Sequence, residues 1–233
     1  PADSFSNVFH SGTDADLTTP IAFVRSSADS TDRFWTNAGV LFKTTNTDPE
    51  AGWTQDAIAS SPTAPLYDLI NFQATGFAES LLVPISTDIS RLTGGAWTGA
   101  WWSGLSGAAA LSANPHRFTV LAGALLFTDG RFINDFDGTI ARDAALTLPV
   151  GFRGEGIITF GEFAFIYGAQ IGGGEAHVYT WARTSDNYIS RYPVGDTEVL
   201  AAFAADSVYI ITKKGMIKRF TGTGFGGENN EWQ

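Results

Sequence analysis

Five short apolar segments recur along the chain at nearly constant spacing, and this regularity limits the possible folds more than any other feature. They begin at residues 40, 82, 125, 165 and 208, so that successive starts are 42, 43, 40 and 43 residues apart. The segments are residues 40–42, 82–83, 125–127, 165–167 and 208–211. A fixed period of this size is typical of repeat architectures, in which each copy is one supersecondary unit.

Each apolar segment is the centre of a longer unit. A turn and a second strand follow it, and the turns in the last three copies contain Asp129-Gly130, Gly172–Gly174 and Lys214-Gly215. Glycine supplies the positive φ that tight hairpins require. A further strand precedes each segment, at residues 33–35, 70–72, 118–121, 157–160 and 199–203. The repeat of about 43 residues therefore predicts a four-stranded unit, and such sheets arranged radially form a β-propeller.

The predicted fold class is all-β, a β-propeller of about five four-stranded blades in a single domain spanning residues 1–233. The 26 glycines and 18 phenylalanines favour turns and aromatic-rich strands over helices. Residues 107–113, rich in alanine, are the one short helical candidate. Residues 1–32 are expected to close the ring, with the strand at 21–25 pairing with the last blade near 216–225, and residues 226–233 to form a polar tail. A sixth, incomplete blade shared with another chain is the alternative.

Charge and composition argue against several function classes. The net charge is −10, with 14 basic and 24 acidic residues, whereas nucleic-acid binding needs a basic stripe. The densest basic cluster, Lys213, Lys214, Lys218 and Arg219, is interpreted as a solvated strand edge. The absence of cysteine excludes disulfides and thiolate metal sites. We expect no nucleic-acid partner and, without an apolar run of about 18 residues, no membrane partner.

Three stretches of the repeat resemble a known family. Residues 128–138 (TDGRFINDFDG), 211–222 (ITKKGMIKRFTG) and 101–104 (WWSG) are similar to the repeats of propeller proteins in tailed-phage virions. The Gly-His and Trp-Asp pairs of the WD40 type are missing, as is the regular Gly-Gly of the kelch type. The resemblance implies a structural role in a phage particle, at the tail or head–tail connector, as part of an oligomeric assembly with other virion proteins. It brings no catalytic residues, and a secreted or extracellular location is the alternative.

Carboxylates are the candidates for catalysis, because five-bladed propellers also host glycosidases. Such enzymes use two carboxylates about 5–10 Å apart, and alternation places Asp135 and Asp137 on one strand face. The spacing singles out no pair, and aspartate before glycine is most often a turn residue. We therefore expect no enzyme activity, with glycoside hydrolysis left open. The further candidates are Asp68, Asp129, Glu155 and Glu162.

Metal and cofactor sites are not expected. The three histidines, His10, His116 and His177, form no ligand-spaced cluster, and zinc needs several converging ligands. Asp14 and Asp16 lack the full spacing of a calcium loop.

The binding candidates are Trp97, Trp101 and Trp102, the densest aromatic cluster in the chain. If this stretch alternates as a strand, Trp101 or Trp102 must face outward, and an exposed tryptophan indicates a contact surface. Protein contact is favoured over sugar. Three hypotheses follow: a structural and binding module of a phage particle, a lectin-like propeller that binds a glycan, and a propeller glycoside hydrolase.

Overall fold

The structure is a computed structural model of the 233-residue chain. It describes residues 23–25, 33–37, 40–44, 54–55, 68–85, 87–112, 117–185, 187–188, 190–221 and 231–233. The chain divides into two compact units, Pro1–Ala113 and Asn114–Gln233. All regular elements among the described residues are β-strands, in agreement with the predicted fold class. The alanine-rich stretch, described over 107–112, forms no helix.

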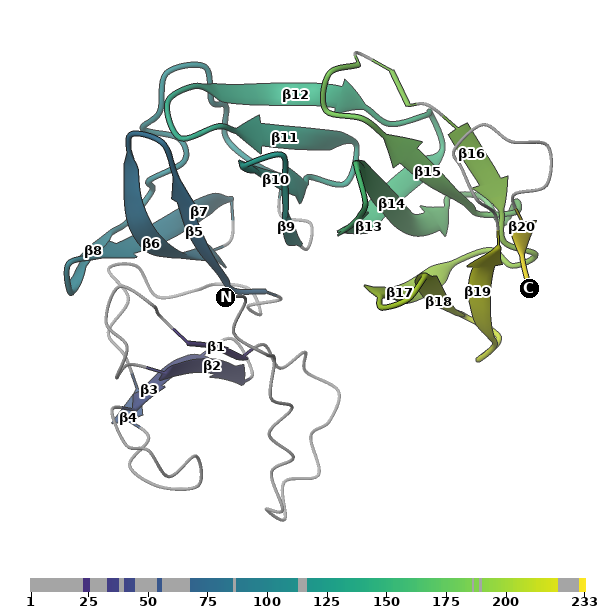
Figure 1. Cartoon of the computed structure of the whole chain (residues 1–233), viewed down its shortest axis with the longest axis horizontal. Coiled ribbons are helices and arrows are strands. Elements are labelled where there is room, and N and C mark those ends of the chain that lie inside the picture. The colour runs from purple at the N-terminus through teal and green to yellow at the C-terminus, as the bar shows by residue number, and fades with distance from the viewer. Residues whose placement is uncertain are drawn as a thin grey trace. The chain divides into compact units, whose positions relative to one another are not determined.

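The described part of the first unit holds eight strands in two four-stranded antiparallel sheets, and each sheet keeps the order of the chain. Its strands are β1 (Phe23–Arg25), β2 (Arg33–Asn37), β3 (Val40–Thr44), β4 (Thr54–Gln55), β5 (Ile70–Ala74), β6 (Phe77–Ile85), β7 (Asp88–Thr93) and β8 (Ala96–Thr98). The sheets are β1–β4 and β5–β8 (Figure 1).

The second unit continues the same pattern in the sheets β9–β12, β13–β16 and β17–β20 (Figure 1). Its strands are β9 (Phe118–Leu121), β10 (Ala124–Thr128), β11 (Phe132–Phe136), β12 (Ala141–Thr147), β13 (Phe152–Phe160), β14 (Phe163–Gln170), β15 (His177–Trp181), β16 (Ser190–Pro193), β17 (Val199–Ala204), β18 (Val208–Thr212), β19 (Ile217–Thr221) and β20 (Glu231–Trp232). Among the first strands of these sheets, β13 packs against both β9 and β17.

The five apolar segments lie in β3, β6, β10, β14 and β18, so the predicted repeat is confirmed as a repeat of sheets. In the last four sheets the segment is the second strand. In the first sheet it is the third, because β1 pairs antiparallel with β2 and adds a strand before it. The sequence predicted the order of these strands in the last four sheets, whereas the extra first strand of the first sheet was not predicted.

The predicted closure of the last blade by an N-terminal strand is wrong. Phe23 pairs with Trp35 inside the first sheet, and the fourth strand of the last sheet comes from the C-terminus, where Phe220 pairs with Trp232. Arg219 and Gln233 exchange two backbone hydrogen bonds, of 2.7 and 2.9 Å, that extend this ladder. The predicted polar tail thus ends in a strand, because its one large apolar side chain, Trp232, is buried.

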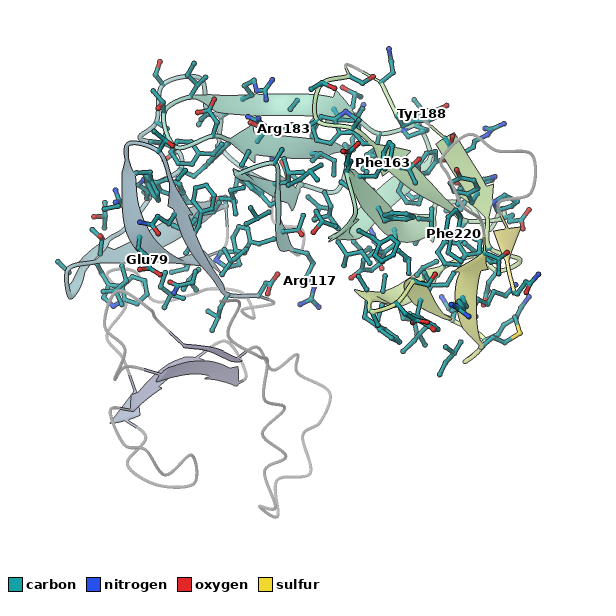
Figure 2. The ribbon with its side chains drawn as sticks, viewed as in Figure 1. Glu79, Arg117, Phe163, Arg183, Tyr188 and Phe220 are labelled. Atoms are coloured by element: carbon teal, nitrogen blue, oxygen red, sulfur yellow. The ribbon has the colours of Figure 1, made fainter. Side chains whose placement is uncertain are left out.

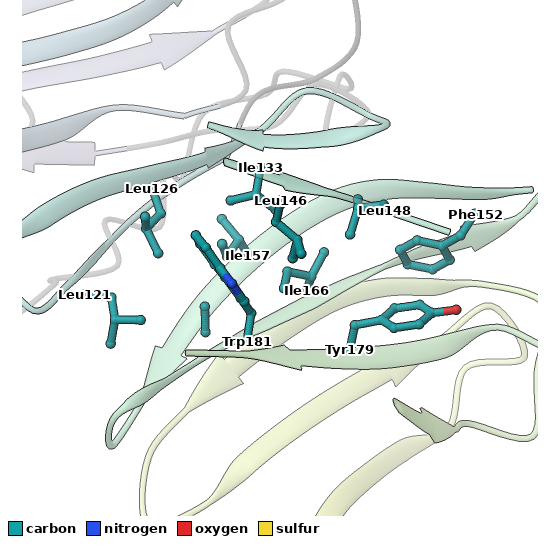
Figure 3. Packing of buried hydrophobic residues seen from close by; sticks show 11 residues of the cluster. Leu121, Leu126, Ile133, Leu146, Leu148, Phe152, Ile157, Ile166, Tyr179 and Trp181 are labelled. Carbon is teal, nitrogen blue, oxygen red and sulfur yellow. The ribbon is translucent and has the colours of Figure 1, made fainter. Parts of the chain in front are cut away.

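Packing between neighbouring sheets makes the core of the second unit. Leu126, Ile133 and Leu146 of the β9–β12 sheet pack against Ile157 and Trp181 of the β13–β16 sheet, and Figure 3 shows the side chains of the two sheets interleaved. All five are at most 2% exposed, so this face of each sheet is closed to water.

The opposite face of the β13–β16 sheet packs against the last sheet. Phe165 and Tyr192 contact Phe220 ring to ring, with centroids 5.7 and 4.9 Å apart, and Phe220 in turn contacts Trp232 at 5.2 Å. Phe220 is labelled in Figure 2. The middle sheet of the unit therefore buries apolar side chains on both faces, as a blade between two blades must.

Glycines set the turns between strands. Gly130 and Gly215, predicted hairpin positions, have φ of 65° and 79°, in the left-handed region that favours glycine. The β7–β8 connection is the pair Gly94-Gly95, with φ of 56° and 80°. Two successive positive φ values define the type I′ turn, whose twist matches that of paired strands.

The Gly215 turn can be tested by a substitution that adds one methyl group. A Cβ at Gly215 would have no atom within 4 Å, so Gly215→Ala adds backbone strain without a clash. We expect a loss of about 1 kcal/mol in unfolding free energy by denaturant titration, and a larger loss for Gly215→Val. Gly104→Ala, which carries no positive φ and only ordinary contacts, is the control. Equal midpoints for the Gly104 and Gly215 variants would show that the turn is wrongly assigned.

Trp232 tests whether the C-terminal strand is part of the fold. Truncating a buried tryptophan to alanine costs about 3–5 kcal/mol, so Trp232→Ala should lower the melting temperature by several degrees. Gln233→Ala removes an exposed side chain from the next residue and should change it little. The same melting temperature for both variants would show that the C-terminal strand does not contribute to the stability of the fold.

Candidate functional site

Trp101 and Trp102, predicted to form a contact surface, are both buried, at 6% and 0% exposed. The expectation that one of them faces outward is wrong, because the segment is a series of turns and not an alternating strand. Asp88 Oδ1 accepts the backbone N–H groups of Ile89 and Trp102 at 2.7 and 3.0 Å. The backbone N–H of Trp101 donates to the Ile89 carbonyl at 2.9 Å. These bonds fold the tryptophans back onto the β5–β8 sheet.

The remaining contacts of the two tryptophans are those of a core. The Trp101 ring lies 5.5 Å from the Phe77 ring, and the Trp102 indole N–H donates to the Ala109 carbonyl at 3.1 Å. Trp97 is half-buried on β8 and packs against the cluster of Leu81, Val83 and Leu92. A binding role for Trp97 stays a prediction. Trp53 and Phe225, at related repeat positions, lie outside the described residues.

Asp135 is the most heavily paired carboxylate in the described part of the chain. It is fully buried on β11 and pairs with Arg142 of the neighbouring strand, Nη2 to Oδ2, at 2.9 Å. Arg183, which follows β15, makes a second ion pair through Nε, and its Nη2 donates to Oδ1 at 3.0 Å. Figure 2 shows Arg183 reaching over the β9–β12 sheet. The hydrogen bond to Asp135 is the main cause that raises the pKa of Arg183.

Asp137 stabilises a turn, whereas Asp135 forms buried ion pairs. Its Oδ1 accepts the backbone N–H groups of Thr139 and Ile140 at 2.9 and 2.8 Å, which makes the β11–β12 turn. The Ile140 and Thr139 hydrogen bonds lower the pKa of Asp137. A lowered folded-state pKa means that this group stabilises the fold above its unfolded-state pKa, and that the gain is lost as the pH falls through the folded value. Asp135 and Asp137 therefore hold an ion pair and a turn, and the two together are not arranged as a catalytic pair.

Three carboxylates gather near Lys213 where the inner strands of the last two sheets begin. Glu198 pairs with Lys213 at 2.7 Å, and Glu155 pairs with Arg153. The hydrogen bond to Glu198, with smaller contributions from Asp196 and Glu155, raises the pKa of Lys213. Sequence reasoning flagged Glu155 and missed Glu198, because nothing in the local pattern indicates that a loop residue reaches a hairpin lysine.

The other flagged acids lie in separate parts of the fold. Asp68 Oδ1 accepts the Leu69 N–H at 2.9 Å, Asp129 is buried beside the β10–β11 turn, and Glu162 is exposed in the turn between β13 and β14. Among the described side chains, no group of three or more His, Cys, Asp or Glu could hold a metal ion. His177 lies in β15 as predicted, whereas His10, His116, Asp14 and Asp16 fall outside the described residues.

A partly exposed aromatic group on the β13–β16 sheet escaped the sequence reasoning. The Tyr188 ring packs edge-on against Tyr179 at 5.1 Å, and His177 lies 6.1 Å from Tyr179 on the same strand face. Arg191 pairs with Tyr179 across β15 and β16. Tyr188 is labelled in Figure 2, at the edge of this sheet. The group offers an aromatic ring beside polar side chains, which is a common composition of recognition surfaces.

The outer face of the last sheet carries exposed apolar side chains. We call it the C-terminal face. The register places Ala201, Ile211 and Ile217 in one row, and Phe203, Tyr209 and Arg219 in the next. Phe203 and Ile217 are 46% and 67% exposed, and the rings of Phe203 and Tyr209 are stacked at 5.0 Å.

No described helix is long and apolar enough to cross a membrane.

The Asp135 ion pairs can be tested by stability measurements. Breaking a buried pair by removing one partner costs about 3–5 kcal/mol, so Asp135→Asn should be strongly destabilising. Arg142→Gln changes a half-exposed partner and should cost about 1 kcal/mol or less. Combining Asp135→Asn with Arg183→Gln should cost clearly less than the sum of the two single losses. Additive losses in denaturant titrations would contradict a direct Asp135–Arg183 interaction.

Comparison with known proteins shows a likeness of fold. No family model and no curated protein matches the chain. The WD40 β-propeller domain of Doa1 matches at TM-score 0.60 with 10% identity, over 86% of this chain and 64% of that one. A nidogen/laminin complex matches at 0.55 with 14% identity, over 86% and 74%, and a candidate gluconolactonase at 0.51 with 12% identity, over 86% and 72%. The chain therefore spans less than two thirds of the first of these structures. At such identities the likeness supports an all-β fold of propeller type.

Proposed function

We propose that this chain is a non-catalytic β-propeller scaffold that binds other proteins, with each four-stranded sheet as one of about five blades. Its proposed place is a structural component of a phage particle, in the tail or head–tail connector region. The partners are other assembly proteins, and neither a cofactor nor a nucleic acid is part of the proposal. The phage assignment rests on the repeat sequences at 128–138 and 211–222, since none of the three structures compared above is described as a phage protein.

The proposal that the chain is non-catalytic is supported mainly by the pairing of its carboxylates with arginine and lysine side chains. Asp135 is held by two arginines, Glu155 pairs with Arg153 and Glu198 pairs with Lys213. A glycosidase needs one carboxyl group that carries a proton and a second that faces the sugar. Carboxylates tied to cations and to backbone amides are typical of structural ion pairs and turns instead.

The proposal that the chain binds other proteins is supported by the C-terminal face. Exposed apolar side chains gathered on one face of a sheet are typical of protein interaction sites. Proteins of propeller fold have many unrelated functions, so the fold alone does not choose a partner. The chemistry of this face favours a protein surface over a polar polymer such as a nucleic acid.

A lectin-like propeller is the second candidate, and one observation favours it. Tyr188 exposes part of its ring and packs against Tyr179, whose other neighbours are His177 and Arg191. An aromatic face with polar side chains nearby suits the apolar face of a pyranose ring. Glycoside hydrolysis is the third, and Glu155 and Glu198 are the carboxylates with which we test it, because both act on the pKa of Lys213.

Co-expression and glycan assays separate these functions. If the chain is a scaffold, co-expression with the products of neighbouring genes should place it in large particles of defined size by sedimentation and electron microscopy. The purified chain should neither be retained on a glycan array nor release sugars from oligosaccharides. Retention that Tyr188→Ala abolishes and Tyr188→Phe preserves would support the lectin. Sugar release lost in both Glu155→Gln and Glu198→Gln would support the hydrolase, and either result would contradict the scaffold.

A further inference from the structure

Four side chains of the β13–β16 sheet form a polar and aromatic group at the end of its apolar cluster. They are Tyr179, Tyr188, His177 and Arg191, and we call them the Tyr188 group. Antiparallel pairing places Arg191 opposite Tyr179 on one face of the sheet. The Tyr179 ring lies 5.1 Å from the Tyr188 ring and 6.1 Å from the His177 ring. All four residues belong to the second unit, and so do the sheets that pack on either face of theirs.

The Tyr179 hydroxyl is a hydrogen-bonding group without a partner. Tyr179 is 3% exposed, because its ring packs edge-on against Phe152 at 4.8 Å and joins the cluster between the β9–β12 and β13–β16 sheets. Figure 3 shows its oxygen pointing away from Trp181, and the oxygen keeps contact with solvent. No described residue forms a hydrogen bond with it. Since a buried tyrosine usually has a hydrogen-bond partner, this hydroxyl lacks one that a ligand can supply.

Arg191 brings a positive charge to the same place. It is exposed on β16, and no carboxylate among the described residues forms an ion pair with it. Burial is the main cause that raises the pKa of Tyr179, Tyr188 adds to the rise, and the charge of Arg191 opposes it. The guanidinium therefore lies close enough to act on the hydroxyl. Because the pKa is raised, the hydroxyl stays protonated and can donate at neutral pH.

These two donors select the chemistry of the ligand. A carboxylate only accepts hydrogen bonds, and its two oxygens match the planar fork of an arginine. A phosphate monoester also matches the fork, but it carries about two negative charges, whereas Arg191 is the one arginine or lysine of the group. A single carboxylate therefore balances the charge of the site. Arginine and tyrosine are also enriched among the residues that dominate binding in protein interfaces.

We propose that the Tyr188 group binds an aspartate or glutamate side chain of a partner protein. The Arg191 guanidinium and the Tyr179 hydroxyl donate to the carboxylate, and the partly exposed Tyr188 ring packs on the methylene groups of the same side chain. This assignment rests on the proposed binding of other proteins and names the chemistry of one contact. The chain has a net charge of −10 and repels acidic peptides in general. Binding of such a peptide therefore requires a local site of this kind.

Nuclear magnetic resonance of the full-length chain with isotope-labelled arginine tests the site directly. The Nε–H signal of Arg191 is assigned by its loss in Arg191→Gln. Titration with acetyl-tetraglutamate amide should shift this signal saturably, with a Kd on the order of 1 mM, and acetyl-tetraglutamine amide should not. Arg131 is the control within the same sample, because it is also exposed and lies 5.6 Å from an aromatic ring, that of Phe132. Its signal should not move.

Substitutions separate recognition from stability. Tyr179→Phe removes a hydroxyl that bonds to no described residue, so the melting temperature should stay unchanged while the Kd for the tetraglutamate peptide rises about 3-fold or more. Arg191→Gln should raise this Kd about 10-fold or more, as followed by the backbone N–H signals of β16. Arg191→Lys keeps the charge but loses the fork, so its Kd should lie between those values. Arg131→Gln, which removes the same charge elsewhere, should leave the Kd unchanged.

Three outcomes would overturn the proposal. If the Arg191 signal stays in place, or moves together with that of Arg131, the group is not a carboxylate site. If inorganic phosphate or a hyaluronan tetrasaccharide shifts the signal at lower concentration than tetraglutamate does, the site takes a phosphate or an acidic sugar instead. An unchanged Kd in Tyr179→Phe would remove the hydroxyl from the site. Particle formation, measured by sedimentation, tests the scaffold function separately, so failure of the site and failure of that function remain distinguishable.

Discussion

Packing of one four-stranded sheet against the next is the constraint on which the rest of the second unit depends. A sheet of four short strands has two broad faces, and each carries apolar side chains at alternate positions. The β13–β16 sheet satisfies both faces, with Ile157 and Trp181 toward one neighbour and Phe165 toward the other. Burial of this kind provides the main favourable free energy of folding. Every sheet therefore needs neighbours, and the last sheet buries Val208 and Ile210 against the preceding one.

Ion pairs add specificity to this apolar packing. Arg183 follows β15 in one sheet and reaches Asp135 in β11 of another, 48 positions away in the chain. A fully buried carboxylate is costly unless it is paired and hydrogen-bonded, so only the arrangement that brings Arg183 and Arg142 together is acceptable. The apolar contacts would tolerate small shifts between sheets, and these bonds do not. The carboxylates that suggested catalysis thus hold sheets and turns in place.

The two kinds of surface that remain differ in what they can recognise. The Tyr188 group combines a partly exposed ring with His177 and Arg191, a composition open to polar ligands. The C-terminal face combines Phe203, Tyr209 and Ile217 with the Arg219–Asp206 ion pair, a mainly apolar composition. Both lie on sheets of the regular repeat, and both expose large side chains, namely Tyr188 in one and Phe203 and Ile217 in the other.

Much of the fold could be predicted from the sequence, because strand periodicity and turn glycines act over a few residues. The segments at 118–121 and 208–211 and the positive φ of Gly130 and Gly215 needed no knowledge of distant contacts. Tertiary structure alone decided that Trp101 and Trp102 are buried, since Asp88 draws their backbone onto β7. It also decided that Trp232 completes the last sheet and that Arg183 meets Asp135. The physical reason is the same in each case: a repeat pattern states which residues need burial or a partner, and only the folded chain determines which partner they find.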